Sequence, residues 1–583
     1  MYLRESRRTN RDGSVVSYLQ LAHNQRNPQT GTSTAKVIHN FGRAEQIDRD
    51  ALARLVASIS RYLTPEQAAA AAGGGEVEVL DSRRLGGSWV LDRLWERLGI
   101  GAAIRAVAAG RRLDGEAVER VVFALVAQRA LEPGSKLAAT RWVGERVAID
   151  GCTGLSDDQA YRAMDFLLDA LDEIAAQIFG SVAHLLNLDL DIVFVDTTST
   201  YWEVETADSD PELADPAADD ELANPAEQAR RAFGHSKDHR DDLPQVVIAM
   251  AVTRDGIPVR CWTFPGDTAD TAIIRTIKDD LGGWGLRRLV WVADRGFASA
   301  ANRAYLTRGG GHYIHAEKLR HTNTEAAAAL ARAGRYRTVA DNLRVKEVHV
   351  APGGDQDGAA DAQEGARTQR FVVCHNPEAA ERDQQVRANL VAHLTQLIDG
   401  SDTWPARRRD ELVGSLRAKP GLRRYLRRTS TGLLRVDHAA IKREQHLDVK
   451  WLLRTSDLTL TPDLTPDDLA AAYKQLIAVE RGWRDMKGAL GLRPVFHHRE
   501  DRIRAHVQLC WLALLLIRVV ETAVGDTWRN VRHELDRMAL VILATDHGRV
   551  AQRSTLTAGH KSILTALGLP EPARYFDFTT TSD

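Results

Sequence analysis

Two aspartates stand directly after predicted buried strands, where side chains can do chemistry at the edge of a sheet. Asp196 follows the short, mostly β-branched run DIVFV and precedes four hydroxyl side chains. Asp294 ends the run RRLVWVA in the same way and precedes a glycine turn. An aspartate followed by threonine or serine is also ordinary turn chemistry. A metal-binding role therefore requires further acids in compatible places.

A third acid, Glu480, falls on a helix predicted over residues 465–491. Thr465 can cap this helix, and Asp468 completes an approximate capping box. The predicted inward stripe reads Leu469, Tyr473, Leu476, Glu480, Trp483 and Lys487. Glu480 thus takes a position expected to be apolar, and a buried acid is costly unless it is paired or bound to metal. A structural pair with Lys487 is the alternative; the two strand-end aspartates favour the metal interpretation.

Three carboxylates of this kind suit hard divalent cations. Mg²⁺ (or Mn²⁺) takes oxygen ligands and leaves part of its shell to water and substrate phosphate. Two such ions, roughly 3.5–4 Å apart, can activate an attacking water or 3′-hydroxyl and stabilise the leaving oxygen. The sequence therefore predicts a site, with two ions, for cutting phosphodiester bonds.

The elements around the aspartates predict how the two come together. After Asp196 the order is strand, strand, strand, helix, strand, helix, strand. This is the layout of an RNase H-like core, in which the first and fourth strands are neighbours. The predicted fold class is α/β within a chain that is α+β overall: an RNase H-like mixed sheet flanked by helices, with a β-rich insertion and a helical N-terminal region.

The length of 583 residues predicts several structural units. A small β-rich unit is expected at 1–75, and a helical region that could bind DNA, bind a partner or simply pack at 76–188. The core is expected in two parts, 189–320 and 461–530, around an insertion at 321–460. A C-terminal helical region is expected at 531–583.

Composition limits the class of protein. The net charge of −2 and the pI near 6.8 neither indicate nor exclude nucleic-acid binding. Much of the acidic charge lies at 203–227, predicted to be a solvated loop, so the rest of the chain is distinctly basic. The four cysteines have no metal-ligand spacing. The N-terminus lacks the apolar segment of a signal peptide, and the longest apolar run is too short to span a bilayer. A cytoplasmic protein with no membrane partner is expected.

A run of basic residues lies inside the predicted insertion. Residues 417–430 include Arg423, Arg424, Arg427 and Arg428 close to one tyrosine. Such a run is usually a solvated face, but beside a phosphodiester-cutting site a role in binding DNA phosphates is at least as well supported.

These motifs together resemble a DDE transposase of a bacterial insertion sequence, from the superfamily marked by Tyr-x2-Arg-x3-Glu-x6-Lys. Tyr473, Glu480 and Lys487 match that signature, whereas Leu476 stands at the arginine position, which puts that contact in doubt. VDTTS and ADRGF resemble the two aspartate motifs of the family. The similarity covers about 190–320 and 450–525, and it implies a β-rich insertion between them.

The resemblance implies an activity and roles for its residues. Asp196, Asp294 and Glu480 would bind the metals, and Tyr473 and Lys487 would contact DNA phosphates. The enzyme would bind double-stranded DNA at the terminal inverted repeats of its element, cut it, and join the 3′ ends to target DNA. A homodimer or higher assembly on DNA is expected. Two alternatives stay open: a nuclease of the same fold without strand transfer, and a DNA-binding protein that has lost catalysis.

Overall fold

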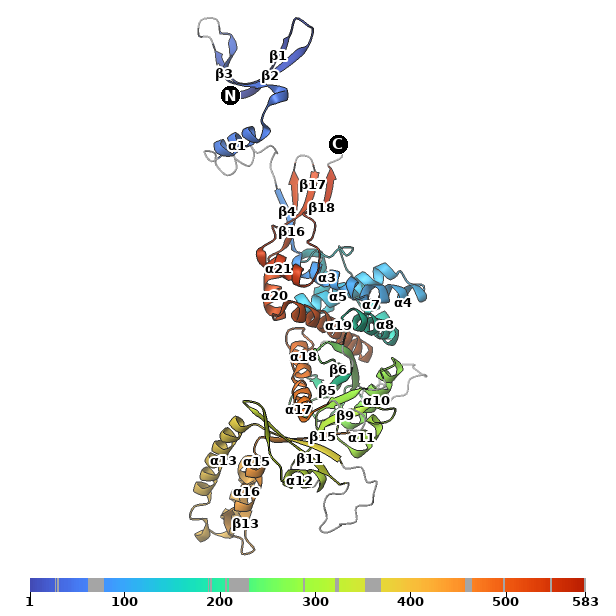
Figure 1. Cartoon of the computed structure of the whole chain (residues 1–583), viewed down its shortest axis with the longest axis vertical. Helices are drawn as coiled ribbons and strands as arrows, with labels where there is room; N and C mark the ends of the chain where they lie inside the picture. The colour runs from blue at the N-terminus through green and yellow to red at the C-terminus, as the bar shows by residue number, and fades with distance from the viewer. Residues whose placement is uncertain are drawn as a thin grey trace. The chain divides into compact units, whose positions relative to one another are not determined.

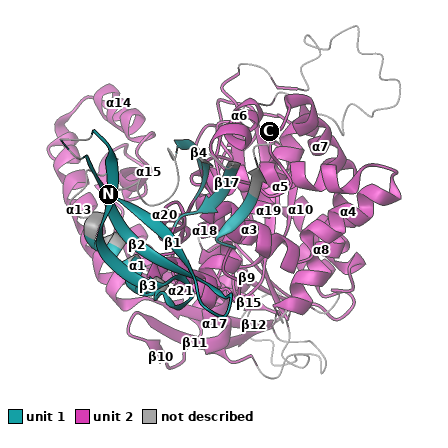
Figure 2. Cartoon of the chain, turned by 90° about the horizontal axis from the view of Figure 1, so that it is seen from above, with its two compact units in different colours: residues 1–82, 540–554, 573–583 teal, residues 83–539, 555–572 magenta. Residues whose placement is uncertain are grey.

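The computed structural model of the chain divides into two compact units, one of residues 1–82, 540–554 and 573–583 and the other of 83–539 and 555–572 (Figure 2). The described residues are 1–26, 28, 31–60, 78–186, 188, 191–204, 207–208, 230–286, 289–319, 324–351, 369–456, 464–495, 497, 499–545 and 548–580. Most of the acidic segment 203–227 lies outside them.

The first unit is built from antiparallel strands. Its three-stranded sheet consists of β1 (Tyr2–Thr9), β2 (Val15–Arg26) and β3 (Ser33–Arg43), and the helix α1 (Arg49–Ser60) follows. A four-stranded sheet has the order β18-β17-β16-β4, with β4 (Glu78–Arg84), β16 (Ala539–Thr545), β17 (Gly548–Arg553) and β18 (Tyr575–Thr580). The prediction of a helical C-terminal region is therefore wrong in part. ALVILAT is a short apolar run that periodicity alone cannot assign, and strand pairing decides it.

The second unit contains a nine-stranded sheet of order β10-β11-β12-β15-β9-β8-β5-β6-β7. Its core strands are β5 (Ile192–Tyr201), β6 (Gln245–Val252), β7 (Pro258–Pro265), β8 (Val290–Ala293) and β9 (His312–Ala316). β5, β8 and β9 are parallel neighbours, while β6 and β7 are antiparallel. The first and fourth strands after residue 190 lie side by side, and the predicted RNase H-like core is confirmed.

The insertion continues this sheet. β15 (Lys450–Thr455) pairs with β9, and β12 (Gln369–His375), β11 (Leu343–Val350) and β10 (Arg337–Ala340) follow outward. Between β12 and β15 the chain forms the helical arm, residues 377–447. It comprises α13 (Pro377–Ile398), α14 (Ala406–Leu416), α15 (Pro420–Arg423), the hairpin β13 (Leu426–Arg428) and β14 (Leu434–Val436), and α16 (His438–Leu447). The strands of the predicted β-rich insertion are present, and the helical arm lies between two of them.

Helices form the rest of the larger unit outside the helical arm and the segment that carries Glu480. They are α3 (Gly86–Arg97), α4 (Ile100–Gly110), α5 (Gly115–Leu131), α6 (Lys136–Glu145), α7 (Asp157–Asp169), α8 (Leu171–Leu185), α10 (Asp270–Gly283), α11 (Ala300–Leu306), α12 (Thr324–Ala331), α19 (Glu500–Val524), α20 (Trp528–Leu535) and α21 (Ala558–Ala566). In the described part of the chain, only α19 is long and apolar enough to cross a membrane. Most of its apolar stretch is buried against α5, α7 and β7, so it serves as a core helix, as predicted.

The segment that carries Glu480 is two helices rather than one. α17 (Pro466–Lys474) begins with the predicted capping box between Thr465 and Asp468. The chain turns at Gln475 and Leu476, and α18 (Ile477–Lys487) then packs on β5 and β6 (Figure 1). The buried face of α18 consists of Val479, Gly482, Trp483 and Met486, and it continues the spacing of the buried Leu469, Ala472 and Leu476.

Candidate active site

The parallel pairing of β5 and β8 brings the two strand-end aspartates together. Val195 and Ala293 are register partners, and Asp196 and Asp294 are the next residues of the two strands. Both acids are partly buried. The two carboxylates are therefore near each other, as the sequence predicted. Asp294 directly follows β8, but Asp196 lies inside β5, which continues to Tyr201 along β6, so the prediction that the first strand ends at Asp196 is wrong.

The surroundings of Asp196 perturb its protonation. Burial, together with the carboxylates of Asp294 and Asp270, raises the pKa of Asp196 to about 6. The backbone N–H of Thr197 and the ammonium of Lys237 oppose this shift. A cluster of acids with one nearby lysine carries excess negative charge, which a divalent cation would neutralise.

Asp270, the first residue of α10, is a fourth acid at this edge. Thr197 Oγ1 donates a hydrogen bond of 2.7 Å to Asp270 Oδ1, and Lys237 Nζ donates one of 2.8 Å to Asp270 Oδ2. The sequence analysis did not single out Asp270, although the motif FPGDTAD that contains it resembles the family pattern. Both of its oxygens have protein partners, so Asp270 fixes Lys237 close to Asp196.

Tyr473 and Lys487 lie on either side of Glu480 in the sequence, and both contact acids. The Tyr473 hydroxyl donates a hydrogen bond of 2.9 Å to Asp294 Oδ1, and burial together with Asp294 raises the pKa of Tyr473. Lys487 Nζ donates to both oxygens of Asp238 at 2.9 Å, and Arg493 pairs with the same acid at 2.9 Å. Asp238 was not anticipated as a partner for this lysine.

Glu480 itself is exposed, and the prediction of a buried position on the inward stripe is wrong. The buried stripe of α17 and α18 runs through Leu469, Ala472, Leu476, Val479, Trp483 and Met486, so Glu480 lies beside this stripe rather than on it. Within the described residues, no group of three His, Cys, Asp or Glu side chains lies close enough together to hold a metal ion. The structure thus brings Asp196 and Asp294 together and leaves Glu480 on the helix that packs against the strand of Asp196.

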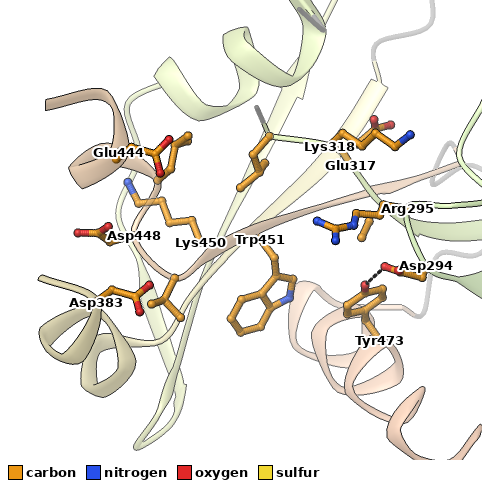
Figure 3. Close-up of a pocket in the computed structure, with 14 residues that line it drawn as sticks. Asp294, Arg295, Glu317, Lys318, Asp383, Glu444, Asp448, Lys450, Trp451 and Tyr473 are labelled. Atoms are coloured by element: carbon orange, nitrogen blue, oxygen red, sulfur yellow. Dashed lines mark hydrogen bonds between the residues drawn. The ribbon is translucent and has the colours of Figure 1, made fainter. Parts of the chain in front are cut away.

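A cavity of about 630 Å³ opens beside Asp294 (Figure 3). Asp294 and Tyr473 line it from the core, and Trp451 from β15. Its lining contains three cations, Arg295, Lys318 and Lys450, and five acids, Asp294, Glu317, Asp383, Glu444 and Asp448. This acidic balance favours a cation over a phosphate. The aromatic at this place, Trp451, was not anticipated, because only the pairing of β15 with β9 brings it to the site.

The predicted arginine cluster lies in the helical arm. Arg424 pairs with Glu444 at 3.0 Å and Arg428 with Asp410 at 2.8 Å. Arg423 and Arg427 are exposed, and among the described residues no carboxylate lies within 4.0 Å of either side chain. Two of the four arginines are therefore available to a ligand.

Comparisons with known proteins place the chain among transposases. Residues 189–516, more than half of the chain, match the transposase DDE domain, and residues 3–70 match the N-terminal domain of IS1634 family transposases. No curated protein matches the chain. One similar solved structure is the piggyBac transposase synaptic complex with hairpin DNA, at 7% identity and a TM-score of 0.32, with 77% of this chain and 79% of that chain covered.

Proposed function

Because the chain belongs to the DDE transposases of insertion sequences, we propose that Asp196, Asp294 and Glu480 are its metal-binding catalytic residues. The observation that carries this proposal is that Asp196 and Asp294 directly follow the register partners Val195 and Ala293 of the parallel strands β5 and β8. The raised pKa of Asp196 supports it: burial is the main cause and the carboxylates of Asp294 and Asp270 add to it, so a bound cation would favour the ionised form.

Glu480 joins this pair from α18. The helix packs on β5 and β6, so a modest change in side-chain conformation or helix position would carry the exposed carboxylate toward Asp196. No hydrogen bond or ion pair to another described residue holds the Glu480 carboxylate elsewhere. We propose that binding of the cations draws it in.

Divalent metal dependence is a general property of the family, and we propose Mg²⁺ or Mn²⁺, as two ions, for this site. Bound metal would supply charge stabilisation and a lowered pKa for the attacking hydroxyl. The protein's own part is positional: Lys237 and Asp270 hold the edge of the sheet in place, and the Tyr473 hydroxyl fixes the Asp294 carboxylate.

The substrate is DNA. We propose that the enzyme binds double-stranded DNA at the terminal inverted repeats of its element, cuts there, and joins the 3′ ends to target DNA. Lys487 and Tyr473, with Arg423, Arg424, Arg427 and Arg428 of the helical arm, are the proposed phosphate contacts. Since two ends must be processed together, we propose a homodimer or larger assembly on DNA, acting in the bacterial cytosol.

The proposal is tested by DNA cleavage with Glu480→Gln, a nearly isosteric change that removes the charge of the ligand. We expect the wild type to cut a fragment bearing the element end with Mg²⁺ or Mn²⁺. The variant should lose at least 100-fold in rate, on the order of a lost metal ligand, and still bind the fragment. Glu381→Gln, on the exposed surface of α13, is the matched control and should cut normally.

Three other outcomes would change the proposal. Equal cutting by wild type and Glu480→Gln would make Glu480 a structural residue. Cutting without joining of the released 3′ end to a target plasmid would indicate a nuclease without strand transfer. Binding without any cutting would indicate a DNA-binding protein that has lost catalysis.

A further inference from the structure

A second cavity, of about 460 Å³, lies in the larger unit between the turn before α6 and the segment that follows α18. We call it the basic cavity. Its charged and ionisable lining residues are Arg129, Lys136, Tyr161, Arg493, His497 and His506, and no Asp or Glu lines it. Its charge balance is therefore opposite to that of the cavity beside Asp294.

The two deepest cations in this cavity have no counterion. Arg129 and Lys136 are each only 2% exposed, and within the described residues no carboxylate lies within 4.0 Å of either. Lys136 Nζ lies 3.4 Å from His506 Nδ1. The Arg129 guanidinium donates to the carbonyls of Gly134 and Gly491, and its buried Nε has no hydrogen-bond partner.

Among the buried arginines of the described residues, Arg129 alone lacks a carboxylate within 4.0 Å; the buried Lys346 also lacks one and donates to the carbonyl of Arg332. The other buried arginines among the described residues each contact a carboxylate: Arg260, Arg370, Arg387, Arg454 and Arg518. A buried cation without a counterion is costly. Burial, with the nearby Arg129, lowers the pKa of Lys136 to about 7, and burial lowers the pKa of His506 well below its usual range. An anion in the cavity would relieve this cost.

The backbone of the cavity is also suited to an anion. The ten-residue helix α6 begins at Lys136, and Gly134, Ser135 and Lys136 at its N-terminus line the cavity. A helix N-terminus carries partial positive charge and attracts phosphate groups. Leu137 at the mouth is 59% exposed, and Gly488 and Ala489 are exposed as well, so the cavity can be reached from solvent.

The basic cavity adjoins the proposed catalytic helix. Gly488 and Ala489 line it and follow Lys487, the last residue of α18. Arg493, which also lines it, shares Asp238 with Lys487. The mouth of this cavity is therefore adjacent to Lys487, so a DNA strand bound at Lys487 would lie close to the mouth.

We propose that the basic cavity binds a phosphoryl oxyanion through Arg129, Lys136 and the N-terminus of α6, and that in transposition this group is a backbone phosphate of the bound DNA. The DNA part of this proposal rests on the proposed function. The oxyanion part does not rest on the proposed function, because binding of free phosphate can be measured without DNA and without catalysis.

The first test uses inorganic phosphate and pyrophosphate with the full-length protein. Calorimetry and thermal unfolding should show binding of either anion to the wild type. Lys136→Met should abolish the anion-induced stabilisation while leaving the anion-free protein as stable or more stable, since it removes a buried charge. Lys561→Met, at an exposed lysine, is the control and should retain the effect. A wild type that binds neither anion would overturn the proposal.

A second variant tests the proposal if Lys136→Met does not fold. Leu137→Glu places a carboxylate at the exposed mouth, where folding does not depend on the side chain. We expect it to weaken anion binding about tenfold, as for one lost charge-assisted contact. Unchanged anion affinity in this variant would contradict the proposed entrance.

DNA binding distinguishes the two sources of phosphate. For a duplex fragment, Lys136→Met should weaken binding about tenfold and reduce the slope of log affinity against log salt by about one. If phosphate binds but the duplex affinity and slope are unchanged, the ligand is free phosphate and the DNA assignment is overturned. Loss of cleavage in Glu480→Gln is independent of this result, so failure of the catalytic proposal would be recognised separately.

Discussion

Asp196 is the residue at which protonation and folding are most directly coupled. Its pKa of about 6 is above the unfolded value of 3.8 because the side chain is buried near Asp294 and Asp270. An acid of this kind stabilises the folded state fully below the unfolded pKa, and that contribution is lost as pH rises through the folded pKa. The metal-free protein should therefore lose stability between about pH 4 and pH 6.

Asp196→Asn tests this linkage. The amide does not ionise, so the variant should gain stability relative to the wild type as pH rises from 4.5 to 7.5, by at most about 3 kcal/mol. Thermal unfolding of both proteins in chelator measures the difference. Addition of Mn²⁺ at pH 7.5 should stabilise the wild type and leave the variant nearly unchanged. Parallel pH profiles for the two proteins would show that Asp196 is not perturbed.

At the scale of elements, the capping box of α17 holds the helix that positions Tyr473. Thr465 Oγ1 accepts from the backbone N–H of Asp468, and the Asp468 carboxylate accepts from the backbone N–H of Thr465. Thr465→Ala removes the first contact and should cost about 1 kcal/mol. Amide hydrogen exchange in 466–474 should become about fivefold faster. The control is Thr395→Ala inside α13. Amide hydrogen exchange in α13 should become slightly slower or stay unchanged in this variant, because alanine favours helix.

At the scale of the whole molecule, the helical arm is inserted between β12 and β15, two strands that pair directly with each other. His375 at the end of β12 and Lys450 at the start of β15 are register partners. A two-residue Asn-Gly turn can join such antiparallel neighbours. Deletion of residues 376–449 removes both Arg387 and Asp448, which form an ion pair, so neither is left without its partner.

A variant with residues 376–449 replaced by Asn-Gly should therefore fold and keep the Asp196–Asp294 pair. It should bind duplex DNA more weakly and with a smaller salt slope, because Arg423 and Arg427 are lost. Circular dichroism and fluorescence anisotropy measure the two properties. The double variant Arg423→Gln with Arg427→Gln in the intact chain separates these contacts from the rest of the arm. Unchanged duplex affinity in the deletion would remove the arm from the DNA-binding surface.

Asp196, Asp294 and the sheet that brings them close together could be predicted from the sequence. Short β-branched runs ending at Asp196 and Asp294 are local signals, and the order of the elements between them is sufficient to make their strands neighbours. The family signature around Glu480 is equally local. These features were predictable because each depends on residue type and spacing along one segment.

Only the tertiary structure decided the features that depend on distant segments. Glu480 is exposed because α18 packs on β5 and β6 with Val479, Trp483 and Met486 buried, and the helix pattern alone does not choose between this stripe and the adjacent one that contains Glu480. β15 brings Trp451 beside Asp294 by pairing across the insertion. The basic cavity is lined by residues from 129–137 and 488–497 and by Tyr161 and His506. No Asp or Glu lines it, and this charge balance becomes apparent only in the folded chain. Burial and counterion distance are properties of the folded chain, and sequence spacing does not encode them.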